Sequence, residues 1–510
     1  MSPDSGRNAV RFPRQRVRLP YPRSRSGCLV CRRQHKKCDE RRPACSRCLA
    51  KGKDCQWPGA VRREADLEKS PSVHDAPSPI REVPSDPSPC REEPFSSTST
   101  SNDVVELEEE LLRLLAPPGC SLGSVSSMFL AHFVGETSRY MTTVSPEKNP
   151  FLTHILPLAF SEELVLHSLL ALGGAHLESR QSSPEINTWV CRHYGRVIHL
   201  LQDIISQKSD QPIDWLRASL ALLMLYLFGV FNSMQSGGAI VHIRAGKKVI
   251  PKLLSAASSK TNSMRTLCGI TFELYTYLSL ITTPTPYDNG TPSELDTRNS
   301  LLLSWELLKS HGGFGVIVSP IHRYLEIIPR VVALCTRRQS ELTFNECSSE
   351  SLMVFNELMA IINTIGCEDD SGSALNLEAR HSLSISAVYR HALTIFAYDA
   401  MWCGTIASDE SRLLIVRQHA LGALTLLPTL MKTHYRNLLL WPTIVIGSCL
   451  LNEEELDIIR SVLSTTQPIF VIMKMRMMLE RLWAENDPVY FGPYGLQKHM
   501  MVHDTVIYLA

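Results

Sequence analysis

Six cysteines within 28 residues near the N-terminus constrain the fold of this chain more than any other feature. Their spacing is C-x2-C-x6-C-x6-C-x2-C-x6-C, and the second triplet repeats the first 17 residues further on. Two thiolates separated by two residues can reach one metal ion from a single turn of chain, as in many tetrahedral zinc sites. A segment of about 30 residues cannot bury enough apolar surface to fold alone, so we expect metal to hold it together. The predicted metal ligands are Cys28, Cys31, Cys38, Cys45, Cys48 and Cys55.

The number of sulfurs predicts the number of metal ions. Two tetrahedral zinc ions need eight ligand positions, so six sulfurs suffice only if two of them are shared. One zinc ion would leave two thiols unused, and an iron–sulfur cluster usually takes four cysteines at other spacings. Three disulfides would need an oxidising compartment, whereas the Arg- and Pro-rich N-terminus lacks the apolar core of a signal peptide. We therefore predict two zinc ions with a structural role, because sulfur fills every coordination position.

Charge is distributed unevenly along the chain. Residues 1–57 contain 16 Lys and Arg against 4 Asp and Glu, a surplus of 12 positive charges, and the whole chain carries only +1. The remainder is therefore acidic, with a net charge of −11. A basic N-terminal region joined to an acidic body predicts a polyanionic partner for the N-terminal region, and nucleic acid is the leading candidate.

The cysteine segment, residues 27–59, resembles a fungal zinc binuclear cluster domain, the DNA-binding module of a large family of fungal regulators. The resemblance covers the six cysteines, the basic run from Arg32 to Lys37, Asp39, Pro43 and Gly52. It implies that Cys28 and Cys45 bridge the two zinc ions. Cys31 and Cys38 would then complete one site, and Cys48 and Cys55 the other.

The resemblance also implies how the module meets double-stranded DNA. The short helix after Cys31 would enter the major groove while basic residues contact phosphates. The family commonly has two basic residues at positions 34 and 35 and reads CGG triplets, whereas this chain has Gln and His there. Gln pairs best with adenine, so we expect CGG-like half-sites with an altered base preference. The predicted DNA-binding residues are Arg32, Arg33, Gln34, His35, Lys36 and Lys37.

Composition divides the chain into segments of different character. The proline-rich segment after the module cannot form a continuous coiled coil, so we expect any homodimer contact to come from the helical region. The N-terminal arm fits nuclear import and nonspecific DNA contact equally well. The predicted segments are a disordered basic arm at 1–27, the zinc module at 28–57, a Pro/Ser-rich linker at 58–102, a short acidic amphipathic helix at 103–118 and an all-helical regulatory domain at 119–510.

Residues 119–510 read as successive amphipathic helices separated by Gly, Pro, Asn and Ser, without a fixed repeat. The segments Asn149-Pro150-Phe151, Leu156 to Ala159 and Leu164 to His176 resemble the start of a fungal-specific transcription factor regulatory domain. Ala218–Phe231 is shorter than the roughly 20 residues of a membrane span, so we predict a buried core helix and no membrane partner. Helices are predicted at 125–140, 161–178, 187–207, 213–231, 238–255, 264–281, 321–337, 351–365, 382–401, 410–431, 453–464 and 469–485.

An enzymatic domain is the competing interpretation of the helical region. The sequence contains no phosphate-binding Gly loop, nucleophile elbow, His-Glu metal helix or carboxylate pair, and the Gly312-Gly313-Phe314-Gly315 cluster is predicted to be a plain loop. We therefore expect no catalytic residue. The family resemblance implies a nuclear, sequence-specific RNA polymerase II transcription factor that contacts the transcription machinery, and family habit, rather than any residue, favours activation of a secondary-metabolite gene cluster. The alternatives are control of nitrogen or amino-acid utilisation and, in another class, a helical ligand-binding or enzymatic domain fused to a DNA-targeting module.

Overall fold

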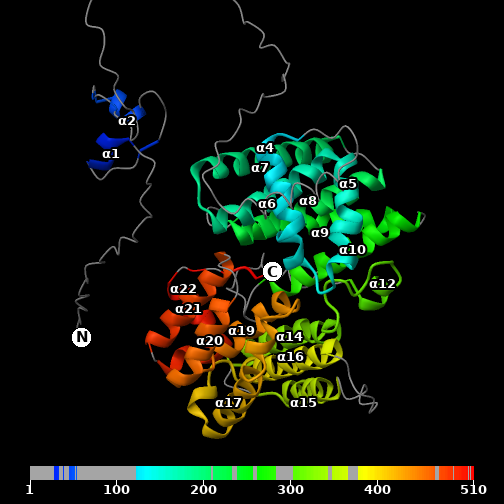
Figure 1. Cartoon of the computed structure of the whole chain (residues 1–510). Helices are drawn as coiled ribbons and strands as arrows, with labels where there is room; N and C mark the ends of the chain where they lie inside the picture. Colours follow the sequence, from blue (N-terminus) through cyan, green and yellow to red (C-terminus); the bar gives the residue numbers. More distant parts are fainter. Residues whose placement is uncertain are drawn as a thin grey trace, which may run out of the picture. The chain divides into compact units, whose positions relative to one another are not determined.

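The computed structural model divides the chain into two units, residues 1–89 and 90–510 (Figure 1). The predicted basic arm, the linker and the acidic helix at 103–118 lie outside the described residues. The structure describes residues 28–33, 38–39, 45–51, 53, 55, 122–207, 211–232, 238–256, 261–282, 303–342, 347–365, 377–465, 470–485, 487–503, 505 and 507–509.

Within these residues every regular element is helical, which confirms the predicted fold class. The first unit contains two short helices, α1 (Leu29–Arg33) and α2 (Ser46–Leu49), each beginning just after a cysteine. The two helices contact each other beside the buried cysteines. This unit has no other apolar core among its described residues, as expected for a module that metal holds together.

The first half of the second unit is built around one largely buried helix, α8 (Pro212–Phe231), which packs against α6 and α9. Figure 1 shows these helices together in cyan and green. They are α4 (Ser124–Gly135), η1 (Thr137–Met141), η2 (Pro146–Lys148), the π-helical turn η3 (Phe151–Ile155), α5 (Leu156–Ser161), α6 (Glu163–Arg180), α7 (Pro184–Ser206), α8, α9 (Ala239–Ala256), α10 (Asn262–Ile281) and α12 (Trp305–Lys309).

The second half is built around the long helix α16 (Leu377–Trp402), which contacts α14, α15, α17 and α19. These helices run from yellow-green to red in Figure 1. They are α13 (His322–Leu325), α14 (Ile327–Leu342), α15 (Ser349–Thr364), α16, η6 (Ile406–Ser408), α17 (Glu410–Leu424), α18 (Leu427–Leu430), η7 (Arg436–Leu439), α19 (Leu440–Gly447), α20 (Glu453–Thr465), α21 (Phe470–Glu485), η8 (Pro488–Tyr490) and α22 (Gly492–Val502).

A helix or a helical pair lies at each of the twelve predicted positions, but several boundaries differ. The predicted helix at 410–431 is two helices, because a new short helix, α18, begins at Leu427 with Pro428 in its first turn. Four helices were not predicted: α5, α12, α19 and α22. In α19 every residue is buried, so its sequence LWPTIVIG carries no polar face from which a helical period could be recognised.

The predicted core helix is confirmed. Two segments, Pro212–Phe231 and Glu410–Leu430, are long and apolar enough to span a membrane by length and composition alone. The first is 83% buried inside the protein, as a core helix is. The second is 33% buried and consists of α17 and α18, with Arg417 of α17 paired to Glu455 at 2.6 Å.

The two halves share one apolar core, and the last described residues join them. Tyr226 of α8 donates a hydrogen bond to the carbonyl oxygen of Leu509 at 2.6 Å, and Leu509 is fully buried. Tyr277 of α10 donates to the carbonyl of Asn437 in η7 at 3.5 Å. Elements far apart in the sequence therefore support each other, and the second unit folds as one body.

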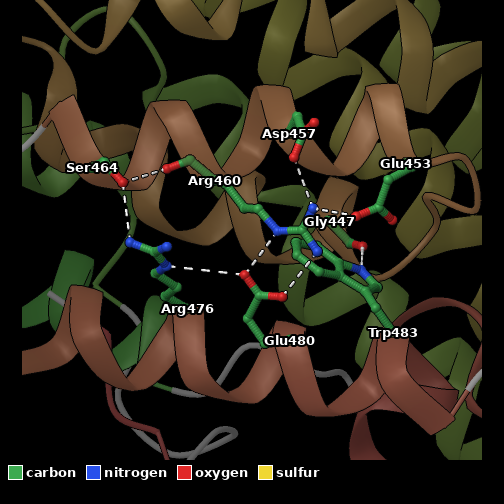
Figure 2. A network of polar contacts seen from close by, with 8 residues as sticks. All are labelled: Gly447, Glu453, Asp457, Arg460, Ser464, Arg476, Glu480 and Trp483. Atoms are coloured by element: carbon green, nitrogen blue, oxygen red, sulfur yellow. Dashed lines mark hydrogen bonds and ion pairs between the residues drawn. The ribbon is translucent and has the colours of Figure 1, made fainter.

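A polar network fixes α20 against α21 (Figure 2). The Arg460 guanidinium bonds both carboxylate oxygens of Glu480, at 2.9 and 3.0 Å, and also reaches Glu453 and Asp457 at 2.6 and 2.8 Å. Trp483 lies beneath the guanidinium at 5.5 Å and donates its indole N–H to the carbonyl of Gly447 at 2.9 Å. Bidentate, charge-assisted bonds of this kind hold two helices in one register.

Two buried histidines lie side by side in the core of the first half. The rings of His132 and His176 are 4.8 Å apart, and Thr137 bonds Nδ1 of His176 at 2.9 Å. Burial lowers the pKa of His132 to about 4 and that of His176 to about 3, and the neighbouring cations add to both shifts. His193, packed against His167 with Nδ1 atoms 2.8 Å apart, has its pKa lowered by burial to about 4. All three side chains are therefore neutral at physiological pH.

We predict that the helical domain loses stability as the pH falls below about 6.5. A histidine whose folded pKa is depressed binds its proton more tightly when unfolded, so acid favours unfolding between pH 6.5 and about 4. Each fully buried ring should cost about 1 kcal/mol of unfolding free energy between pH 6.5 and 5.5. Burial raises the pKa of Glu273 to about 7, so protonation of this carboxylate stabilises the folded state as the pH falls through the same window. Because Glu273 is one group against three histidines, it offsets only part of the loss.

Urea unfolding of the full chain at pH 7.0 and 5.5 measures this dependence. His176→Gln should reduce the loss of unfolding free energy between the two pH values. His199→Asn, at a side chain that is 66% exposed, should leave this loss unchanged. Equal losses for the wild type and His176→Gln would contradict the prediction.

Candidate functional site

The two halves of the cysteine module repeat the same backbone contacts 17 residues apart. The N–H of Cys31 donates to Sγ of Cys28 at 3.4 Å, and the N–H of Cys48 donates to Sγ of Cys45 at the same distance. The carbonyls of Cys28 and Cys45 each accept a 3.0 Å hydrogen bond from the residue four positions on. Each C-x2-C pair therefore folds into one turn of helix that aims backbone donors at its first sulfur.

The sulfur atoms of the two pairs lie at the separation that a tetrahedral zinc ion requires. Sγ of Cys28 is 3.8 Å from that of Cys45 and 3.7 Å from that of Cys48. Sγ of Cys31 is 3.7 Å from that of Cys45. With Zn–S bonds of about 2.3 Å, the edge of a tetrahedron is about 3.8 Å long. The side chains present therefore fit zinc coordination in both type and spacing.

The remaining two cysteines, Cys38 and Cys55, also lie beside this cluster. Cys38 lies within 4.8 Å of Cys45, with Asp39 beside it, and Sγ of Cys55 accepts the N–H of Cys45 at 3.3 Å. The carboxylate of Asp39 accepts the N–H of Ser46 through both oxygens at 3.2 Å. This bond ties the end of the first half to the start of α2. The structure thus brings together all six sequence-predicted cysteines.

Burial and backbone donors act in opposite directions on the thiols. Burial raises the pKa of Cys31 to about 12 and also raises that of Cys48. Although burial alone would do the same to Cys28 and Cys45, the N–H groups aimed at their sulfurs lower the pKa of both. A cation is therefore needed to hold all these sulfurs as thiolates, and acid should compete with it.

Of the six predicted DNA-contacting residues, the structure describes two, Arg32 and Arg33. Arg32 and Arg33 occupy the last turn of α1 and are exposed, while Cys31 beside them is buried in the cluster. Gln34, His35, Lys36 and Lys37 lie outside the described residues. Lys51 and Lys53, in the second half, are also exposed. The module therefore carries positive charge on its surface and sulfur inside.

The glycine cluster near residue 313 is a loop whose donors serve the protein itself. The N–H groups of Gly315, Ile317 and Val318 all donate to the carboxylate of Glu273 in α10, at 3.0, 3.0 and 2.9 Å. Gly313 and Gly315 have φ of 82° and 88°, which favours glycine at both positions. These donors already bind a buried carboxylate, which argues against a phosphate in the same place.

Comparison with known protein families agrees with both parts of this geometry. The model described as the fungal Zn(2)-Cys(6) binuclear cluster domain matches residues 26–64. The model described as the fungal specific transcription factor domain matches residues 128–494, more than half of the chain. The chain belongs to the fungal-specific transcription factor family.

Individual relatives within this fungal family match shorter stretches. The transcription factor lfc1 of Flammulina velutipes is 34% identical over 139 residues, 27% of this chain and 47% of that protein. The Zn(2)-C6 fungal-type transcription factor afumD of Aspergillus fumigatus is 29% identical over 229 residues, 44% of this chain and 51% of that protein. The chain thus spans about half or less of the length of these curated relatives. No solved structure matches the chain.

Membership of this family has two direct consequences for the site. The Zn(2)-Cys(6) module holds two structural zinc ions at its clustered cysteines, as the sequence predicts. The helical unit matches the fungal specific transcription factor domain over residues 128–494, the family that the sequence resembles. Ligand-binding groups in that domain could not be predicted from the sequence, because groups on helices far apart in the chain leave no local pattern.

Proposed function

We propose that this chain is a nuclear, sequence-specific, DNA-binding regulator of RNA polymerase II transcription rather than an enzyme. The observation that carries the proposal is the cysteine cluster, whose sulfur spacing fits zinc, together with the exposed Arg32 and Arg33. Both arginines lie on α1, the helix that begins just after Cys28. Residues 34–37 continue the basic run from that helix. A basic helix held by buried metal is suited to the major groove, where side chains contact bases and phosphates.

For the metal cluster, we propose that all six cysteines are ligands and that Cys28 and Cys45 bridge the two ions. Each of these two sulfurs lies near sulfurs of both halves: Cys28 near Cys48, and Cys45 near Cys31. They also lie 3.8 Å from each other, as the shared edge of two fused tetrahedra requires. Cys31 and Cys38 complete one site, and Cys48 and Cys55 the other.

We predict that substitutions of bridging and terminal cysteines differ in their effect on zinc content. Cys28→Ala or Cys45→Ala removes a ligand from both ions and should reduce zinc binding at both sites. Cys55→Ala should affect mainly one ion. Native mass spectrometry of the full chain gives the stoichiometry, and Cys347→Ala, at an exposed cysteine of the helical domain, is the matched control. Retention of both zinc ions by Cys28→Ala would refute the bridging assignment.

The target genes are a separate proposal. We propose that the chain activates a secondary-metabolite gene cluster, with nitrogen or amino-acid utilisation as the alternative, as family resemblance suggests. Activation requires contact with the transcription machinery, for which the helical domain offers the larger surface. Mapping the genomic sites that the chain occupies in its source organism distinguishes the two pathways, because each predicts a different set of neighbouring genes.

The DNA half-site should depart from plain CGG. Gln34→Ala and His35→Ala should each change the base preference at one position, by about 1 to 3 kcal/mol for a good bidentate contact. Lys36→Ala and Lys37→Ala should instead weaken binding to all sequences and reduce the salt dependence, because lysine contacts phosphates. Selection from a random DNA pool with the wild type and these four variants measures both effects. Unchanged preferences in the Gln34 and His35 variants would place base recognition elsewhere.

A specific observation favours a second function for the regulatory domain, the binding of a small effector. A cavity of about 50 Å³ lies between the two halves, where α8 and α10 meet η7, α19 and α21. Its walls are mostly aliphatic and aromatic, for example Leu227, Val230 and Leu274. An effector there would contact both halves and so stabilise their packing.

Polar groups at one side of this cavity indicate the chemistry of the effector. The side-chain Nδ2 of Asn437 is buried there without a hydrogen-bond partner. The Arg436 guanidinium lines the same cavity and lies 3.8 Å above the ring of Tyr140. A donor and a cation beside apolar walls suit a small apolar molecule that ends in a carbonyl or carboxylate group. We therefore propose a short-chain carboxylic acid or ketone as the class of effector.

Short aliphatic carboxylates should raise the unfolding midpoint of the full chain more than alkanes of the same length, since a ligand stabilises the state that it binds. Val230→Phe fills the cavity and should abolish this shift. Val241→Phe, at a side chain that is 56% exposed, is the matched control and should keep it. Thermal unfolding with and without each compound measures the effect. An equal shift in wild type and Val230→Phe would exclude this cavity as the binding site.

A further inference from the structure

A second group of metal-ligand side chains lies in the helical domain, far in sequence from the cysteines. Glu485 is the last residue of α21, and His499 and His503 lie one helical turn apart at the end of α22. The carboxylate Oε1 of Glu485 is 3.3 Å from Nε2 of His499 and 2.7 Å from Nε2 of His503. One ligand atom from each residue lies within 4.8 Å of the others. All three atoms therefore surround one small volume.

The central member of this group is buried without a satisfied hydrogen bond. The side chain of His499 is 1% exposed, and neither ring nitrogen has a hydrogen-bond partner, although Nε2 faces the carboxylate. A buried polar group normally pairs with the protein or with a ligand. A neutral imidazole has the lone pair with which histidine binds metals.

We propose that Glu485, His499 and His503 form a binding site for a transition-metal cation of the zinc class. Two imidazoles and one carboxylate are a common ligand set of zinc sites with three protein ligands, in which water takes the fourth position. With bonds of about 2.0 to 2.2 Å, tetrahedral ligand atoms lie about 3.4 Å apart. The Glu485–His499 separation is already close to this value. The Glu485–His503 pair needs to open by less than about 1 Å to admit the ion.

Rigid elements hold the three ligands in place. The contacts of Figure 2 fix α21 just before Glu485: Arg460 ties it to α20 through Glu480, and Trp483 ties it to α19 through the carbonyl of Gly447. At the start of α22, the N–H of Tyr494 donates to the carboxylate of buried Asp399 at 2.6 Å. The backbone N–H of His503 donates to the carbonyl of His499 at 3.1 Å, so the two rings keep their helical register. Ligands on supported helices lose little freedom when the ion binds.

The ion would join α21 to α22 at their adjoining ends. The two helices also contact each other, and Figure 1 shows them next to each other. The sequence shows no His-Glu metal helix here, because the carboxylate comes from α21 and the histidines from the end of α22. His503 is followed directly by the last few residues of the sequence, which include the buried Leu509 that binds α8. The metal would therefore stabilise the path by which the C-terminal segment returns to the first half.

Zinc titration of the full chain tests this proposal. The wild type, with its cysteine cluster loaded, should bind a third zinc ion per chain at low micromolar free zinc, measured by native mass spectrometry. Glu485→Gln and His503→Asn change side chains that are 34% exposed and should stop at two ions with the same circular dichroism. His199→Asn is the matched control, because His199 pairs with Asp203 at 3.0 Å one turn away but has no third ligand group beside it among the described residues, and this variant should still bind three ions.

Cobalt binding to the zinc-loaded wild type gives a second readout that needs no variant. The third site should show visible cobalt absorption without the strong thiolate-to-cobalt bands of a cysteine site. Zinc should also raise the unfolding midpoint of the wild type but not that of His503→Asn. A wild type that stops at two ions under saturating zinc would overturn the proposal. Three ions in both Glu485→Gln and His503→Asn would also overturn it, because the third ion would then lie elsewhere.

Discussion

Zinc–thiolate coordination is the constraint on which the DNA-binding part of this chain depends. The described residues of the module contain two helices of five and four residues and no apolar core apart from the cysteines themselves. Such short helices are not stable alone, since nucleating the first turn costs more than it gains. Metal bonds replace the missing packing, and Asp39 adds the hydrogen bond that joins the halves. Because the metal cluster forms the interior, exposed positions of the module are free to carry charge, and Arg32, Arg33, Lys51 and Lys53 are exposed and basic.

The helical domain, in contrast, has a large apolar core, and several polar side chains are buried within it. Glu273 is fully buried, yet three backbone N–H groups of the glycine-rich loop bond its carboxylate. His132 and His176 remain neutral: their rings contact each other and Nδ1 of His176 bonds the Thr137 hydroxyl, while Nε2 of each ring has no hydrogen-bond partner. The carboxylate of Glu273, in contrast, ties α10 to the glycine-rich loop. A buried carboxylate bonded in this way specifies one arrangement of these elements, because any other arrangement would leave it unsatisfied.

A bound ligand would affect the packing of the helical domain most directly at the interface between its two halves. The polar side of the proposed effector cavity comes from η7, whereas its apolar wall comes largely from α8 and α10. The C-terminal segment crosses back to α8, and the proposed metal site lies just before that crossing. Ligands at either place would act on the packing of the same two halves. A ligand that binds one packing better than another shifts the population toward it, which is the physical basis of an effector-controlled regulator.

The sequence alone determined the zinc module and most of the helical domain. The cysteine spacing is local, so two metal ions and their ligands could be predicted without knowing any distant contact, and amphipathic periods located helices such as α7 and α9. The tertiary structure alone decided what periodicity cannot encode. It located α19, which is buried on every side, and paired the Gly315 loop with Glu273. It also brought Glu485 beside His499 and His503. These outcomes depend on packing between segments far apart in the chain, because a side chain's partner there is set by how whole helices cross rather than by its sequence neighbours.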